Sequence, residues 1–128
     1  MMFERGRFFA GTVVVLLAII AGTLVYQQVG RASPKFPTDF QAVLLTTGQV
    51  YYGRLRGFGT AYPVLTDVFY VKSQMDSNTK QVTNILVRRG NEWHGPDRMY
   101  LNPGHIVVVE PVSPTSQVAK LIAEQQSK

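Results

Sequence analysis

The chain has 128 residues and no cysteine, which excludes disulfides and thiolate metal sites and leaves room for one small folded domain. Its formal net charge is +5, but residues 1–35 hold four basic residues against one acidic residue, and the remainder holds nine against seven. Most of the excess therefore flanks an N-terminal apolar run, where cationic side chains meet lipid headgroups. The folded part lacks the strong positive charge that is typical of nucleic-acid-binding proteins.

An apolar run covers residues 8–26, FFAGTVVVLLAIIAGTLVY, and no charged residue lies between Arg7 and Arg31. As an α-helix this run would span about 28 Å, which matches the hydrocarbon core of a bilayer. The sequence therefore predicts a transmembrane helix preceded by a tail of residues 1–7. The alternative is a cleaved signal peptide, but the run exceeds the usual length of about 7 to 15 apolar residues, and residues 30–32 form a poor cleavage site.

Basic residues flank this run on both sides, Arg5 and Arg7 before it and Arg31 and Lys35 after it. Because the count is equal, only the N-terminal amine favours an N-terminus inside the cell and a domain outside the cytoplasm. Residues 27–37 contain two Pro, one Gly and one Ser without apolar periodicity, and they are predicted to form a short tether.

Five β-strands are predicted within a domain of residues 38–112. Each is a short run of branched, aromatic or aliphatic residues bounded by turn residues: 42–45, 49–55, 64–71, 81–88 and 105–112. The polar residues 73–80 predict a hairpin turn, and residues 89–103, with two Gly and two Pro, predict a loop. Residues 113–128 are predicted to form a short amphipathic helix with Ser113 as its N-cap.

The segment 44–55, LLTTGQVYYGRL, combines a Gly that opens the second strand with Tyr51 and Leu55, which are predicted to point inward, and with Gly53 at a sharp bend. Residues 103–109, PGHIVVV, look like a closing motif for the last strand. On these residues the domain resembles the Sm-like fold, which implies an all-β domain, a small, strongly bent, five-stranded Sm-like or SH3-like barrel. The whole chain is also similar to a group of small membrane-anchored bacterial proteins. Neither resemblance implies an activity.

Sm-like proteins that bind RNA use an acidic residue and an amide before the third strand and a basic residue before the closing Gly. Here residues 56–64, RGFGTAYPV, contain no Asp or Asn, and Pro103 occupies the basic position, so the RNA pocket is not carried over. A membrane-tethered Sm-like RNA-binding module remains the alternative function. Its surface would combine basic and aromatic side chains: Arg54, Arg56, Arg88, Arg89, Tyr52 and Phe58.

Four residues with metal-binding or acid–base side chains lie close in sequence: Glu92, His94, Asp97 and His105. Their spacing matches no known zinc site, and a loop rich in Gly and Pro normally uses such groups to satisfy its own backbone. No Cys is present and no Ser lies in a nucleophile elbow. We therefore expect no catalytic residue, no metal site, no cofactor and no enzymatic activity.

Period-two alternation places Val50 and Tyr52 on the outside of the second strand, while Trp93 and Tyr100 lie in the long loop. Exposed apolar and aromatic side chains of this kind are typical of a protein contact surface, unless the C-terminal helix covers part of them. The sequence thus predicts a non-enzymatic, single-pass accessory or scaffold subunit of a membrane assembly. Its expected partners are the lipid bilayer and other membrane protein subunits; self-association is left open, and nucleic acid is not expected.

Overall fold

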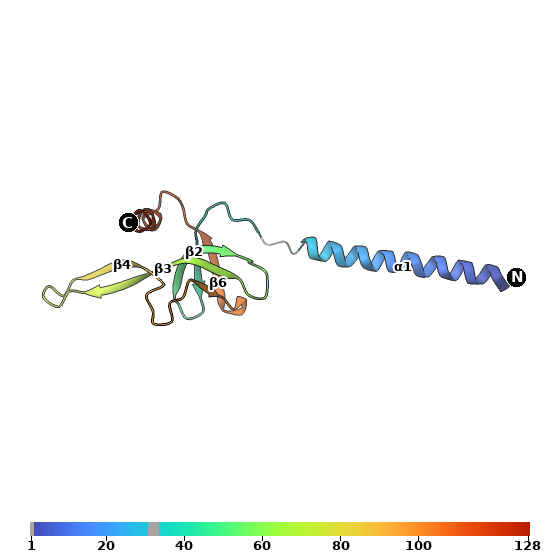
Figure 1. Ribbon diagram of the computed structural model, residues 1–128, viewed down its shortest axis with the longest axis horizontal. Coiled ribbons are helices and arrows are strands. Elements are labelled where there is room, and N and C mark those ends of the chain that lie inside the picture. Colours follow the sequence, from blue (N-terminus) through green and yellow to red (C-terminus); the bar gives the residue numbers. More distant parts are fainter. Residues whose placement is uncertain (1, 31–33) are drawn as a thin grey trace. The chain divides into compact units, whose positions relative to one another are not determined.

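The computed structural model describes residues 2–30 and 34–128, with the side chains of residues 9–26 and 34–128. The chain divides into two compact units, residues 1–32 and residues 33–128, and each is described by itself. The first unit contains one helix, and the second contains an antiparallel sheet with one further α-helix (Figure 1).

Helix α1 spans Met2–Gly30. Its segment Phe9–Tyr26 is uncharged, exposed along its length and has a mean hydropathy of 2.3, so this helix is long and apolar enough to cross a membrane. The hydroxyl of Thr23 donates to the carbonyl oxygen of Ile19 at 2.8 Å, which satisfies the hydroxyl within the helix. α1 exceeds the predicted transmembrane segment at both ends, because the first proline after the apolar run, Pro34, comes only beyond the helix.

Six antiparallel strands form one sheet in the second unit, in the order β4-β3-β2-β1-β6 with β5 paired to β3. The strands are β1 Gln41–Leu45, β2 Val50–Arg56, β3 Val64–Met75, β4 Val82–Arg88, β5 Arg98–Tyr100 and β6 Ile106–Pro111. A short 3-10 helix, η1 Pro103–His105, leads into β6. All five predicted strands are present, close to their predicted bounds.

The sheet differs from the prediction in two respects. A sixth strand, β5, lies inside the predicted loop of residues 89–103, because Arg98–Tyr100 pair with residues 64–66 of β3. The sheet is also not closed, since among the described residues β4 pairs with β3 alone and β6 with β1 alone. The fold is therefore mostly β-sheet with an N-terminal and a C-terminal helix.

Strand β3 bends near its middle, at Asp67. The φ angle of Asp67 is +49°, in the left-handed region that is uncommon for residues other than Gly. Residues 64–66 of β3 pair with β2 and β5, and Phe69 still pairs with Tyr52 of β2. Residues 69–75 pair with β4 in a hairpin that extends past the other strands (Figure 1). The tip of the hairpin starts at Asp76, so the turn is shorter than the predicted residues 73–80.

Side chains on one face of the bent sheet form the first core. Its buried members come from β1, β2, β3 and the segment after β5: Val43, Leu55, Leu65, Val68 and Leu101. Tyr51 packs against this cluster, so Tyr51 and Leu55 both point inward, as predicted.

The opposite face carries a second core, which helix α2 (Gln117–Gln126) covers. Phe69 and Leu86 of the sheet are buried there against Ile122 of α2. The side-chain amide of Gln125 also donates to the carbonyl oxygen of Leu86 at 2.7 Å, which ties the helix to β4. The predicted C-terminal helix is thus present and packed on the domain.

The helix α2 starts three residues later than the predicted N-cap. Its N-cap is Ser116, whose hydroxyl oxygen accepts from the backbone N–H of Ala119 at 3.1 Å. Ser113, the predicted cap, instead accepts the backbone N–H of Ser116 in a preceding turn at 3.0 Å. Both serines have side chains suited to an N-cap, and Ser116 serves as the cap because the helical residues follow it directly.

Candidate functional site

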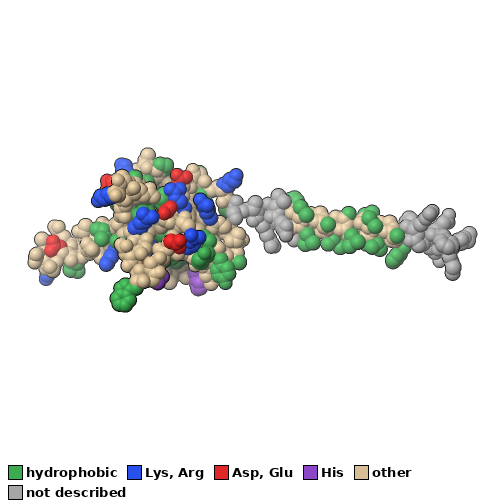
Figure 2. Space-filling view, in the orientation of Figure 1, with side chains coloured by type: hydrophobic (Ala, Val, Ile, Leu, Met, Phe, Trp, Pro, Cys, Tyr) green, Lys and Arg blue, Asp and Glu red, His purple; other side chains and the backbone are tan. Residues whose placement is uncertain are grey.

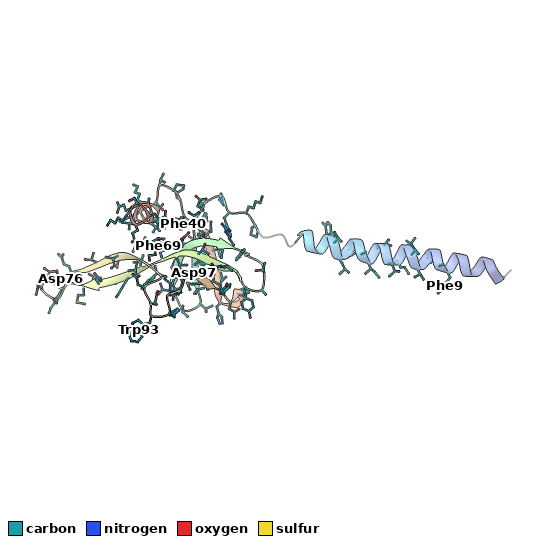
Figure 3. All side chains as sticks on the ribbon, in the orientation of Figure 1. Phe9, Phe40, Phe69, Asp76, Trp93 and Asp97 are labelled. Atoms are coloured by element: carbon teal, nitrogen blue, oxygen red, sulfur yellow. The ribbon has the colours of Figure 1, made fainter. Side chains whose placement is uncertain are left out.

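Trp93 lies in the segment that joins β4 to β5, here called the Trp93 loop (residues 90–96). Its side chain is fully exposed and projects away from the domain (Figure 3). Large aromatic side chains are usually covered, because each removes about 150–250 Å² from water when it packs. Such exposure makes Trp93 the clearest candidate for a docking residue in the described part of the domain.

The Trp93 loop is held in shape by Glu92. The carboxylate of Glu92 accepts from the backbone N–H of Gly90 at 2.8 Å and from Nε of Arg89 at 3.1 Å. The N–H of Gly95 donates to the Glu92 carbonyl at 2.8 Å. The hydrogen bond from Gly90, supported by Arg89, lowers the pKa of Glu92 below its ordinary value, so the loop is organised around an ionised carboxylate.

Arg89 connects this loop to the sheet. Besides its ion pair with Glu92, its Nη1 lies 3.1 Å from the sulfur of Met99, and its guanidinium lies 5.8 Å from the centre of the Tyr51 ring. Met99 and Tyr51 both pack against the first core. The loop that carries Trp93 is therefore connected through Arg89 to residues that pack on the first core.

A cleft of about 480 Å³ lies beside the Trp93 loop, between β3, the end of β4 and β5. Charged side chains line it: Asp67, Arg88, Arg89, Asp97 and Arg98. They neutralise one another, since Arg88 Nη2 lies 3.3 Å from Asp67 Oδ1 and Arg98 Nη2 lies 3.0 Å from Asp97 Oδ2. The guanidinium of Arg98 holds the pKa of Asp97 below its usual range. The cleft therefore holds ion pairs rather than a concentration of one charge.

The four predicted contact residues fall into two groups. Tyr100 of β5 is 66% exposed, like Trp93 on the preceding loop. Val50 and Tyr52 are partly buried on β2, and Tyr52 packs against the second core. Tyr52 therefore packs on the core that contains Ile122 of α2, which agrees with the alternative that the C-terminal helix covers part of the predicted surface. Trp93, in contrast, is fully exposed.

The basic residues of the alternative nucleic-acid surface are mostly paired with acids. Arg54 of β2 and Arg88 of β4 both contact Asp67, at 3.1 and 3.3 Å, and Arg89 contacts Glu92 at 3.1 Å. Figure 2 shows the same mixture, with basic and acidic side chains next to each other on the visible face of the domain. A surface neutralised in this way attracts a phosphate backbone weakly.

Sequence reasoning missed the central position of Asp67. Its two arginine partners also lie over aromatic rings, Arg54 at 4.6 Å from the ring centre of Phe40 and Arg88 at 5.9 Å from that of Phe69. These two rings meet edge to face with their centres 6.4 Å apart (Figure 3). The only signal in the sequence is an Asp within an apolar strand, a residue that is depleted in strands and tolerates the left-handed conformation.

Within the described part of the chain, no three His, Asp or Glu side chains lie close enough to hold a metal ion. His105 lies outside the Trp93 loop, and its Nδ1 is 3.1 Å from the hydroxyl of Thr46. Of the predicted membrane-flanking residues, Lys35 is exposed, while Arg5, Arg7 and Arg31 lie outside the residues whose side chains are described.

No protein-family model matches the sequence, and no characterised protein is significantly similar to it. The functional interpretation therefore rests on the residues and geometry of the chain itself.

Proposed function

We propose that the protein is a non-enzymatic, single-pass membrane-anchored accessory or scaffold subunit, whose domain binds another subunit of a membrane assembly. The observation that carries the proposal is the full exposure of Trp93 in the middle of a loop fixed by hydrogen bonds. Trp is enriched among the residues that dominate binding energy. A loop that is already ordered loses little entropy when it binds.

The proposed contact surface consists of the Trp93 loop and Tyr100. Anchoring by α1 restricts the domain to the vicinity of the bilayer, where membrane partners meet it at a high effective concentration. A modest interface is then sufficient for stable association. Tyr52 and Val50 are left out of this surface because both are partly buried on β2.

Two finer features belong to the same proposal. The kinship of the sheet with the Sm-like and SH3-like barrels belongs to the proposal and rests on the sequence segments 44–55 and 103–109. An orientation with the N-terminus inside the cell and the domain outside the cytoplasm belongs to the same proposal.

The RNA-binding alternative receives less support, because Arg54, Arg88 and Arg89 are paired with carboxylates. Self-association is supported by the edges of β4 and β6, each of which has one sheet neighbour among the described residues. Light scattering of the purified protein in detergent tests it.

Trp93→Ala in the full-length chain tests the contact surface. We expect an unchanged melting temperature, since surface substitutions usually change stability by less than about 0.5 kcal/mol, together with loss of the protein that co-purifies in mild detergent. Tyr62→Ala is the matched control, because Tyr62 is an aromatic residue that is 68% exposed in the connection between β2 and β3. Retained association in Trp93→Ala, or equal loss in Tyr62→Ala, would contradict the assignment.

Leu17→Arg tests the anchor, because Leu17 lies near the centre of Phe9–Tyr26. An Arg at the middle of a membrane-spanning helix costs about 3 kcal/mol on insertion scales, so the variant should become soluble or be degraded. Leu17→Ile should stay in the membrane fraction. The intact mass of the native protein tests for cleavage. A mass that corresponds to a chain beginning near Ser33 would refute a retained anchor.

A further inference from the structure

A second cleft, of about 540 Å³, lies where the chain enters the domain. Residues 34–41 form one side of it, and the end of β2 with the following turn forms the other. Three cationic side chains line it, those of Lys35, Arg54 and Arg56, and of the described lining residues Asp39 alone is acidic. The lining is therefore positive, unlike that of the neutralised cleft beside the Trp93 loop.

Two of these cations have no partner among the described residues. Arg54 is committed to Asp67 through a contact of 3.1 Å. Lys35 and Arg56 are exposed and take part in none of the ion pairs of the described residues. A guanidinium supplies a planar fork of donors and an ammonium supplies a compact charge, and both are common phosphate ligands.

Phe36 holds the entrance of the chain against the domain. It packs on the first core, and its ring meets that of Phe58 edge to face with centres 6.0 Å apart. Lys35 directly precedes Phe36 and Arg56 lies two residues before Phe58. The backbone at both cations is therefore held at the cleft, while their exposed side chains are free to turn toward a ligand.

The covalent chain ties this cleft to the membrane helix. Only residues 31–35 separate α1 from Phe36. A segment of that length spans at most about 20 Å when fully extended. Anchoring by α1 would therefore keep the cleft within reach of the lipid headgroups, which lie just outside the hydrocarbon core.

We propose that this cleft binds the phosphate of an anionic phospholipid headgroup, with Lys35 and Arg56 as its ligands. The inference rests on the membrane anchoring in the proposed function. A lipid headgroup and free inorganic phosphate present the same phosphate chemistry to the cleft, so inorganic phosphate is the competing ligand. Binding at the cleft would orient the domain relative to the bilayer and so present the Trp93 loop in a constant direction.

The experiment uses the full-length protein in an uncharged detergent, titrated with phosphatidylglycerol, phosphatidylcholine or inorganic phosphate and followed by native mass spectrometry. The wild type should prefer phosphatidylglycerol. The double variant Lys35→Gln/Arg56→Gln should lose about 30-fold in affinity for it, as expected for two cations near an anionic headgroup. The control Lys72→Gln/Lys120→Gln removes the same charge from exposed positions on β3 and α2, and it should change the affinity by less than about twofold.

Equal affinity of the two double variants would overturn the proposal. Displacement of phosphatidylglycerol by millimolar inorganic phosphate would show that the cleft binds free phosphate rather than a lipid headgroup. Both double variants should keep the wild-type melting temperature, because the changed side chains are exposed. The proposed function is tested by other experiments. It would fail if the native protein were not retained in the membrane fraction, or if Trp93→Ala kept its binding partner, and neither result depends on the lipid titration.

Discussion

Gly53 faces Leu65 so closely that a Cβ at position 53 would lie 2.8 Å from Leu65 Cγ and 2.7 Å from the carbonyl oxygen of Thr66. The register between β2 and β3 shifts at the same place, between Tyr52 and Arg54. The backbones of the two strands therefore approach each other only because residue 53 has no side chain.

Gly53→Val is expected to destabilise the domain by about 1–3 kcal/mol through overpacking, although Val has the better strand propensity. Urea unfolding measures the difference. Thr83→Val, at an exposed position of β4, introduces the same side chain without a collision and should change stability by less than about 0.5 kcal/mol. Equal stability of the two variants would show that the strands separate at Gly53 without cost.

Tyr52→Ala is expected to lower the free energy of unfolding by about 2 kcal/mol, less than the cost for a fully buried aromatic residue. The reason is that Tyr52 packs on the second core beneath α2 and is only partly buried. Thermal unfolding measures this, with the exposed Tyr62→Ala as the control. Unchanged stability combined with lost co-purification would instead place Tyr52 in the partner interface.

The alternation of side chains along β2 was predictable, and the structure confirms that Tyr51 and Leu55 face the first core. The fate of the opposite face was not predictable, because α2 docks there through Ile122, far away in sequence. The alternation of residues shows which side chains point to the same face of a strand. Only the tertiary fold decides whether another element covers that face.

The same reason explains the missed strand β5. Arg98–Tyr100 lie in a segment rich in Gly and Pro, and they form a strand only because residues 64–66 of β3 offer free backbone partners. The exposed Trp93 was a predicted contact residue, yet the hydrogen bonds from Gly90 and Arg89 to Glu92, which hold its loop, are visible only in the folded loop. The bend at Asp67 likewise depends on strands on both sides of it.

Asp67→Asn and Asp67→Val separate the charge of Asp67 from its backbone conformation. Asn keeps the tolerance for positive φ and removes only partly exposed ion pairs, so it should cost less than about 1 kcal/mol. Val at φ +49° should cost at least about 2 kcal/mol, because a β-branched residue is strained there. Equal costs in chemical denaturation would mean that β3 straightens without penalty.

The last prediction concerns pH and uses Trp93, which is the only tryptophan in the chain, as a reporter of its own loop. The pKa of Glu92 is lowered in the folded protein, first by the N–H of Gly90 and further by Arg89. A lowered pKa means that the loop gains stability above the ordinary pKa of Glu, about 4.3, and loses it as the pH falls through the folded value. The indole N–H resonance of Trp93 should therefore shift as the pH falls below about 5.

Glu92→Gln should remove this shift, because the amide oxygen still accepts from the N–H of Gly90 but does not titrate. Asp97→Asn is the control for the other nearby carboxylate. The pKa of Asp97 is also lowered, first by its hydrogen bond from Arg98, yet this hydrogen-bond partner lies on β5. The Asp97→Asn variant should keep the transition of the Trp93 resonance. If Glu92→Gln keeps the transition and Asp97→Asn abolishes it, the loop is held by the charge pair on β5, and the role assigned to Glu92 is wrong.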